Sequence, residues 1–216
     1  MVRALDDRLP QDIAFLDVKE VDEDWNPRMA EYRVYRYRLE CIEFWQDPGE
    51  VFNEWLAMFV GTYDARNFAR LEEGKNPIRT ILSCEPWRVD GRVVGFEIVG
   101  EAFLWNQVRR TAMALHRMCI GEISPKAVRE ALDHPEKEAD FGVAPPDWLM
   151  LWGVHWNQLP LDSTVVDIQC FSAPPVGPTV ERTMRKRWRQ AAKHELKSLL
   201  HNEWARLGEL PIVKHR

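Results

Sequence analysis

The chain has 216 residues, of which 45% are apolar and 29% are charged, a composition typical of a folded globular protein. Its net charge of -5 excludes a uniformly basic nucleic-acid binder, because such proteins bind phosphates through an excess of Lys and Arg. No apolar run approaches the ~20 residues that span a bilayer, and the first thirty residues lack the basic and apolar regions of a signal peptide. We therefore expect a protein of the cytoplasm with no membrane partner.

The elements expected near the start of the chain are a helix remnant, two strands and a helix. Residues 2–8 are expected to be the remnant of a helix, because they end at Leu9 and Pro10 and no capping residue or first turn precedes them. Residues 12–21 and 33–42 alternate apolar and polar side chains, as half-buried strands do. Residues 48–60 repeat apolar side chains at helical spacing. The chain is thus expected to begin inside a helix.

A β-hairpin is expected next. Residues 79–88 and 92–99 are rich in β-forming side chains and flank Asp90 and Gly91. An Asp-Gly pair between two such runs is typical of a tight hairpin turn, because both positions adopt positive φ there.

Three helices are expected in the rest of the chain, over residues 103–119, 124–132 and 179–207. In the first, apolar side chains recur at steps of three and four residues, and Gly121 is placed to end it. Ser124 and Pro125 are the cap and first residue of the second. The third has an apolar side that extends from Met184 to Trp204.

The remaining segments are a loop over residues 134–147, strands over 148–156 and 165–171, and a proline-containing linker over 173–178. Hairpins are present, and strands and helices do not alternate in a strict βαβ order. The sequence therefore predicts an α+β fold with a mostly antiparallel sheet flanked by helices.

No metal or cofactor site is indicated. The cysteines are widely spaced, without a C-x-x-C pair or a His at ligand spacing; they are Cys41, Cys84, Cys119 and Cys170. We interpret them as reduced thiols of the core.

The strand over residues 33–42 carries the first candidate site. Period two places Arg33, Tyr35 and Tyr37 on one face and Arg36 on the other, with Arg28 a short way upstream. An aromatic ring on such a face can lie against a base while guanidinium groups bind phosphate. An exposed β face made of residues that favour strands is the alternative.

The second candidate site is the start of the helix over residues 103–119. The helical rotation of about 100° per residue places Arg109 at the margin of the core and Arg110 in solvent. Asn106 and Gln107 lie where a helix start offers amide groups to an anion. Arg109 can therefore bind a buried carboxylate or phosphate of a functional site, or it can form a structural salt bridge.

The third candidate site is the basic stretch of the last helix, made of Arg182, Arg185, Lys186, Arg187, Arg189 and Lys193. Such a run can follow an RNA backbone, and Arg185 and Arg189 are our candidate ligands. A solvated helix face explains the same run equally well.

Six motifs in residues 1–156 resemble, in order and spacing, those of the tRNA pseudouridine synthase family of the TruA type. Residues 9–13 resemble its L-P-x-D-I, 25–28 its F-x-x-R, 33–37 its R-x-Y-x-Y, 61–68 its G-T-H-D-F-x-x-F, 79–81 its R-x-I, and 100–109 its G-x-x-F-x-x-x-x-V-R.

This resemblance implies the pseudouridine synthase fold, an isomerase that converts uridine to pseudouridine in the anticodon arm of tRNA, and homodimers. It also implies that no metal or organic cofactor is used. Tyr35 corresponds to the family's Tyr that stacks on the target uracil, and Arg109 to the Arg that pairs with the catalytic Asp. The family flips the target base out of its stack, which explains the need for an aromatic wall.

The chain departs from the family pattern at several places. The R-T-D-x-G-V-H motif that holds the catalytic Asp does not occur in the 216 residues, so the chain as it stands is expected to be inactive. Trp105 and Asn106 stand where many members have His-His, Ala65 where many have Phe, and residues 148–151 where the family has G-L-x-L. These changes leave the choice of substrate open.

Two interpretations account for the missing Asp. Either the sequence is truncated before that segment, or it is a non-catalytic RNA-binding or dimerisation module derived from the family. We favour truncation, because the uncapped helical turns of residues 2–8 are marginal on their own. Residues 1–156 are then the C-terminal half of a catalytic domain, 157–178 a linker and 179–216 a basic C-terminal helix.

Overall fold

The computed structural model describes residues 20–156, 171–174 and 182–209. The chain folds as two units, one made of Met1–Pro27 with Thr164–Arg216 and the other of Arg28–Ser163. The predicted helix over residues 2–8 lies outside the described residues. So do nearly all of the predicted strands over 12–21 and 165–171 and most of the linker over 157–178.

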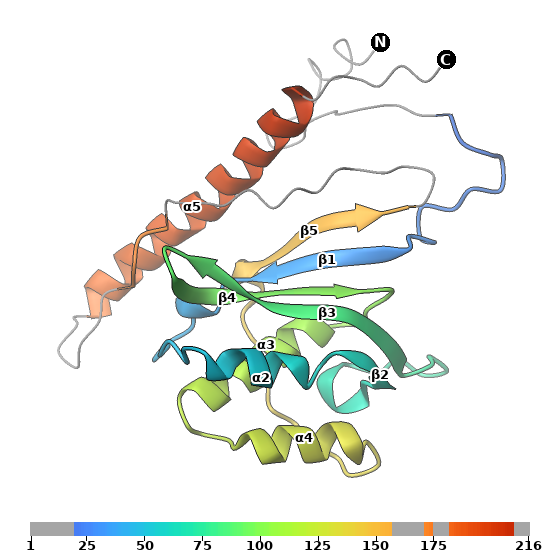
Figure 1. Cartoon of the computed structure of the whole chain (residues 1–216), viewed down its shortest axis with the longest axis horizontal. Coiled ribbons are helices and arrows are strands. Elements are labelled where there is room, and N and C mark those ends of the chain that lie inside the picture. Colours follow the sequence, from blue (N-terminus) through green and yellow to red (C-terminus); the bar gives the residue numbers. More distant parts are fainter. Residues whose placement is uncertain (1–19, 157–170, 175–181, 210–216) are drawn as a thin grey trace. The chain divides into compact units, whose positions relative to one another are not determined.

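The larger unit is built on a five-stranded antiparallel sheet in the order β2-β3-β4-β1-β5 (Figure 1). Its strands are β1 (Tyr32–Tyr37), β2 (Gly61–Asp64), β3 (Ile78–Val89), β4 (Arg92–Gly100) and β5 (Leu149–His155). The predicted α+β fold with an antiparallel sheet is confirmed. β1 ends earlier than predicted, since a 3-10 helix follows over Leu39–Cys41, and the buried Arg38 just before it forms an ion pair with Glu40.

Three helices, α2 (Val51–Ala57), α3 (Gln107–Cys119) and α4 (Pro125–Asp133), lie on the same side of the sheet (Figure 1). Short 3-10 helices cover Arg66–Phe68, termed η2, and Pro146–Trp148, termed η3. Fully buried side chains of the sheet, α2 and α3 form the core, among them Tyr37, Phe52, Leu56, Phe96, Ile98 and Leu115. One face of the sheet thus carries the helices that the apolar spacing predicted.

The local signals for turns and caps are confirmed. Asp90 and Gly91 have φ of 50° and 77°, as a tight hairpin between β3 and β4 requires. The Ser124 Oγ accepts a hydrogen bond from the Ala127 amide at 3.2 Å and caps α4. Gly121 follows α3 with φ of 72°.

The start of α3 was predicted wrongly, because the helix begins at Gln107 rather than at residue 103. Asn106 has a left-handed backbone with φ of 62°, which a continuous helix does not allow. Just before it, the Trp105 carbonyl accepts a hydrogen bond from the Arg70 amide at 2.8 Å. This contact spans 35 positions in sequence, so apolar spacing within the segment does not reveal it.

The smaller unit contains α5 (Arg182–Glu209), which confirms the helix predicted over residues 179–207. Within this unit, the Trp188 indole donates to the Ser172 carbonyl at 3.1 Å, and the Ser172 amide donates to the Glu195 carboxylate at 3.0 Å. No helix of the described ranges has the length and apolar character needed to cross a membrane.

The cysteine prediction is confirmed in part. In the ranges that the structure describes, no disulfide joins Cys41, Cys84 and Cys119; the first two are buried and the third is partly buried. Burial raises the pKa of Cys119 to about 12, which keeps its thiol protonated. Cys170 lies outside the described residues.

Candidate active site

Tyr35 lies in the middle of β1, on the side of the sheet that faces α3. Its ring meets Phe103 edge to face, with the ring centroids 5.1 Å apart. Across the sheet it pairs with Ile98 on β4 and Leu151 on β5, and Leu151 is 50% exposed. Burial raises the pKa of Tyr35, against a smaller lowering by Arg33, so its hydroxyl stays protonated at neutral pH. The result is a half-buried aromatic ring among apolar neighbours.

Tyr37, two residues further along β1, ties the strand to the segment that follows α4. It is fully buried, and its hydroxyl donates to the Pro145 carbonyl at 2.7 Å. Burial raises its pKa strongly, and the positive charge of Arg109 opposes this rise. The Arg109 Nε donates to the neighbouring carbonyl, that of Ala144. Arg109 therefore lies near Tyr37, on the side of the sheet that also carries Tyr35.

Arg109 is held by its surroundings on α3. Its Nε donates to the Ala144 carbonyl at 2.7 Å and its Nη1 to the Asn106 Oδ1 at 2.9 Å, while its own carbonyl accepts from the Ala144 amide. The side chain is half-buried, as the helical rotation predicted. These bonds use only part of its N–H donors, and no carboxylate within the described ranges forms an ion pair with it.

Asn106 and Gln107 both make contacts within the protein, and the binding of RNA by Asn106 stays a prediction. The Asn106 side chain turns back to Arg109 instead of capping α3. Gln107 is 1% exposed, and its Oε1 accepts from the Leu104 amide at 2.9 Å. Its burial does not fit the predicted contact with RNA. Arg110, predicted in solvent, forms an ion pair with Asp140 at 2.9 Å.

The Arg33 side chain forms hydrogen bonds to backbone carbonyls and is not fully exposed to solvent. Its Nη1 donates to the Glu101 carbonyl at 2.6 Å and to that of Ala30 at 3.5 Å, and its Nη2 donates to that of Arg28 at 2.7 Å. These bonds attach the segment before β1 to the end of β4. Arg28 itself is exposed. Binding of RNA by Arg28 and Arg33 stays a prediction.

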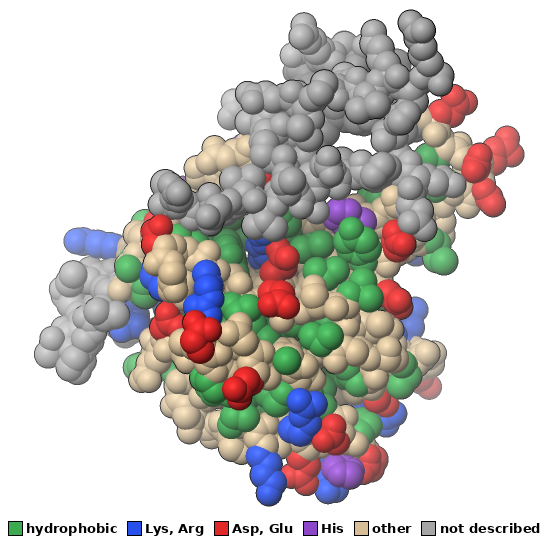
Figure 2. Space-filling model, viewed as in Figure 1, with side chains coloured by type: hydrophobic (Ala, Val, Ile, Leu, Met, Phe, Trp, Pro, Cys, Tyr) green, Lys and Arg blue, Asp and Glu red, His purple; other side chains and the backbone are tan. Residues whose placement is uncertain are grey.

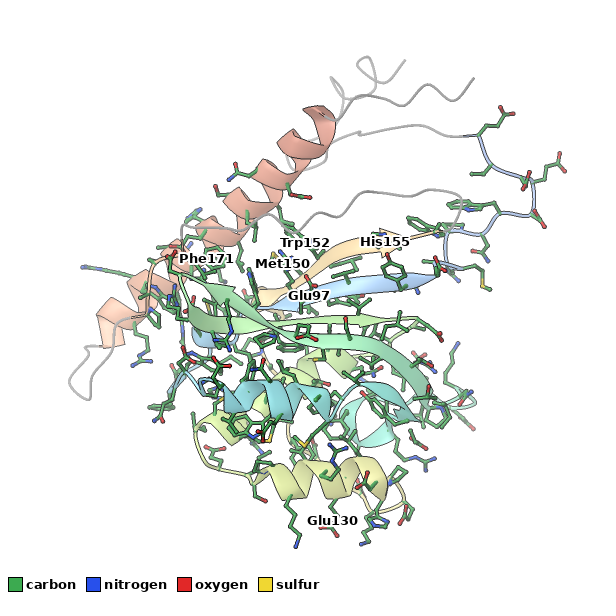
Figure 3. The ribbon with its side chains drawn as sticks, viewed as in Figure 1. Glu97, Glu130, Met150, Trp152, His155 and Phe171 are labelled. Carbon is green, nitrogen blue, oxygen red and sulfur yellow. The ribbon has the colours of Figure 1, made fainter. Side chains whose placement is uncertain are left out.

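Arg36 lies on the face of the sheet opposite Tyr35. Its Nε forms an ion pair with Glu97 at 2.7 Å, and its guanidinium stacks 4.0 Å from the centroid of the Trp152 ring. Glu97 and Trp152 lie at the sheet, away from Glu130 on α4 (Figure 3). The predicted use of Arg36 as an RNA ligand does not fit this position, because the side chain is buried and does not share the surface of Tyr35.

Arg185 and Arg189 lie on α5, in the other unit, and both are partly buried. Their predicted contact with RNA stays a prediction. On the face of the molecule in view in Figure 2, acidic and basic side chains are interspersed rather than gathered in one basic patch. No group of His, Cys, Asp or Glu side chains that could hold a metal occurs in the described ranges.

Residues to which the sequence assigned no role in the site also line this side of the sheet. Tyr63 on β2 packs against Ala65, Ala69 and Leu104. Burial raises the pKa of Tyr63, opposed by a smaller lowering from the Gln107 amide. The Arg70 guanidinium lies 4.3 Å from the centroid of the Trp105 ring. The family motif over residues 61–68 and the departures at Ala65 and Trp105 marked these positions, but not their contacts.

Comparison with known proteins supports the family that the motifs indicated. Residues 56–157 match the model of a family described as tRNA pseudouridine synthase. The chain is 33% identical over 156 residues to tRNA pseudouridine synthase A of Methanocorpusculum labreanum, covering 71% of the chain and 53% of that protein. It is 34% identical over 169 residues to that of Methanoculleus marisnigri, covering 75% and 59%.

The match to tRNA pseudouridine synthase A of Thermococcus sibiricus is longer. It has 31% identity over 197 residues and covers 90% of the chain and 67% of that protein. The chain spans little more than half the length of several other relatives, with 53% to 54% coverage. With the sheet, Tyr35 and Arg109 in place, these matches show that the chain belongs to the tRNA pseudouridine synthase family.

Proposed function

We propose that this chain forms the uridine-binding side of the active site of an enzyme that isomerises uridine to pseudouridine in tRNA. The observation that carries the proposal is that Tyr35 of β1 and Arg109 of α3 lie on the same side of the sheet. The resemblance assigns these two residues to the target uracil and to the catalytic carboxylate.

The reaction needs no co-reactant. The glycosidic bond moves from N1 to C5 of the uracil, while C5 loses a proton and N1 gains one. Taking the base out of its stack costs a few kcal/mol, and stacking on an aromatic side chain returns about 1–3 kcal/mol. Tyr35 supplies that ring, with Phe103 against its edge and the exposed Leu151 beside it.

Arg109 is proposed to orient the catalytic carboxylate. Its bonds to Ala144 and Asn106 hold the guanidinium in place, and its remaining donors suit a charge-assisted pair. The R-T-D-x-G-V-H motif does not occur in the 216 residues. We therefore propose that the catalytic carboxylate comes from a polypeptide segment that is not among them.

The remaining assignments are also proposals. The substrate is tRNA, modified in its anticodon arm, and the enzyme works as a homodimer in the cytoplasm. Arg28 and Arg33, with Arg185 and Arg189 of α5, contact phosphates. A guanidinium already bound to carbonyls, as in Arg33, can still contribute its charge to phosphate binding.

The test uses the complete protein, meaning the protein that includes the proposed segment with the catalytic Asp. Its substrate is a tRNA transcript labelled with tritium at C5 of uridine, because isomerisation releases that atom. Arg109→Ala should lower the rate of release by about 100-fold or more, as loss of one charged group at a reacting centre does. The matched control is Arg110→Ala, on the same helix and bound to Asp140, which should change the rate only a few-fold.

Equal rates for the wild type and Arg109→Ala would refute the role given to Arg109. The alternative function, a non-catalytic RNA-binding or dimerisation module, rests on the absence of the Asp motif from the sequence. Native protein with the mass of 216 residues that binds tRNA with a steep salt dependence, yet releases no tritium, would establish it.

A further inference from the structure

Trp105 and Arg70 form a stacked pair just before α3. The Arg70 guanidinium lies 4.3 Å from the centroid of the indole ring, and the Arg70 amide donates to the Trp105 carbonyl at 2.8 Å. Both the side chains and the backbones of the two residues therefore meet, which fixes the indole more firmly than a single contact does.

The segment that carries Trp105 is packed against buried apolar side chains. Leu104, directly before Trp105, is buried against Ala65 and Ala69, and Tyr63 packs on the same cluster. Trp105 itself is 52% exposed. A single exposed apolar side chain needs no special explanation, but here a large ring is held in place while half of its surface stays open.

The pair lies beside the candidate active site. Trp105 is followed by Asn106, whose Oδ1 accepts from Arg109, and two residues before it lies Phe103, whose ring meets Tyr35. Consecutive Cα atoms are about 3.8 Å apart, so the backbone of Trp105 lies within about 8 Å of that of two residues that contact the proposed catalytic groups.

Charge indicates what the pair binds. Arg70 is exposed, and no carboxylate of the described ranges forms an ion pair with it. An exposed ring beside a cation complements a planar group that carries a negative charge, as a nucleotide does.

We propose that Trp105 and Arg70 bind a nucleotide of the tRNA that neighbours the target uridine. The base stacks on the indole and the phosphate lies at the Arg70 guanidinium. This inference rests on the proposed function, and it assigns the pair a role in substrate selection. The alternative is a purely structural pair that fastens residues 65–70 to the start of α3.

The test compares wild-type complete protein with Trp105→Ala, Trp105→Phe and Arg70→Gln, measuring KM and kcat for tRNA by tritium release. Loss of one stacked base corresponds to about a 5- to 150-fold loss of affinity. We expect Trp105→Ala to raise KM by about 10-fold or more with a smaller change in kcat, and Trp105→Phe to restore most of the loss. Phe44→Ala, at a 70% exposed aromatic outside this segment, is the control and should leave KM unchanged.

A second measurement separates binding from structure. Once the modified uridine has been mapped, each flanking nucleotide is made abasic in turn. At one flanking position, the loss caused by Trp105→Ala should disappear, because the base that it contacts is already missing. A purely structural pair would lower activity equally on intact and abasic tRNA, and that result would overturn the inference.

The outcomes also separate this inference from the proposed function. Wild-type protein that forms no pseudouridine overturns both. Active wild type with unchanged KM in Trp105→Ala and Arg70→Gln overturns the stacking site alone. If Trp105→Ala does not fold, as judged by its melting temperature, Arg70→Gln decides the question, and a wild-type KM in that variant overturns the site.

Discussion

Asn106 offers a way to test how the position of Arg109 affects catalysis. Its side-chain oxygen accepts from the Arg109 Nη1 at 2.9 Å, while its backbone adopts φ of 62°. Asn106→Gly keeps the left-handed backbone and removes only the hydrogen bond. Asn106→Ala removes the same bond and adds a left-handed strain of about 1–2 kcal/mol.

The expected size follows from the charge on Arg109. A hydrogen bond to a charged group is worth about 1.5–3 kcal/mol, which corresponds to about 10- to 150-fold in rate if it acts only through the position of the guanidinium. The bond is partly buried, and the Ala144 carbonyl still holds Nε. We therefore expect the lower end of this range, a fall in kcat of about 10-fold with KM nearly unchanged.

The assay is tritium release by the complete protein, together with thermal unfolding of each variant. Asn106→Gly should melt close to the wild type, and Asn106→Ala should melt about 4 °C lower because of the backbone strain. Both should lose the same activity. Full activity in Asn106→Gly would refute the idea that this bond positions Arg109, and a loss confined to Asn106→Ala would assign the effect to the backbone instead.

Three further predictions concern stability. Asn67 is buried and makes three hydrogen bonds to α4 and to the loop after it, so Asn67→Ala should lower the unfolding free energy by about 2–4 kcal/mol in a denaturant titration, and a loss below 1 kcal/mol would contradict this. A Cβ on Gly95 would overlap the Tyr37 carbonyl, so Gly95→Ala should prevent soluble expression or lower the melting temperature sharply, whereas Gly91→Asn should be tolerated. Burial lowers the pKa of His116, so the unfolded state takes up its proton first and stability should fall as pH drops below about 6.5. His116→Gln should flatten that part of a melting-temperature profile, and an unchanged slope would exclude His116 as its source.

Much of the fold could be predicted because its signals are local. The positive φ of Asp90 and Gly91 belongs to the turn itself, and the Ser124 cap involves residues three positions apart. Alternation along β1 also predicted correctly that Tyr35 and Arg36 point to opposite faces. In each case, the atoms that decide the conformation are neighbours in the sequence.

The predictions that did not hold depend on distant partners. α3 starts later than its apolar spacing indicates, because Arg70 pairs with the backbone before it. Gln107 looked like a polar residue at an open helix start, but the packing around Leu104 and Tyr63 buries it. Neither contact leaves a pattern within its own segment.

The sequence by itself determined the α+β class, the hairpin, the helix caps and the family, since these depend on local backbone preferences and on the order of motifs. Arg33, Arg36 and Arg109 are the same residue type, and only the tertiary structure shows that their side chains have different partners. Arg33 binds carbonyls, Arg36 binds Glu97 on the opposite face, and Arg109 keeps donors available beside Tyr37. What a guanidinium group can do depends on the groups within about 3 Å of it, and folding brings those groups from far along the chain.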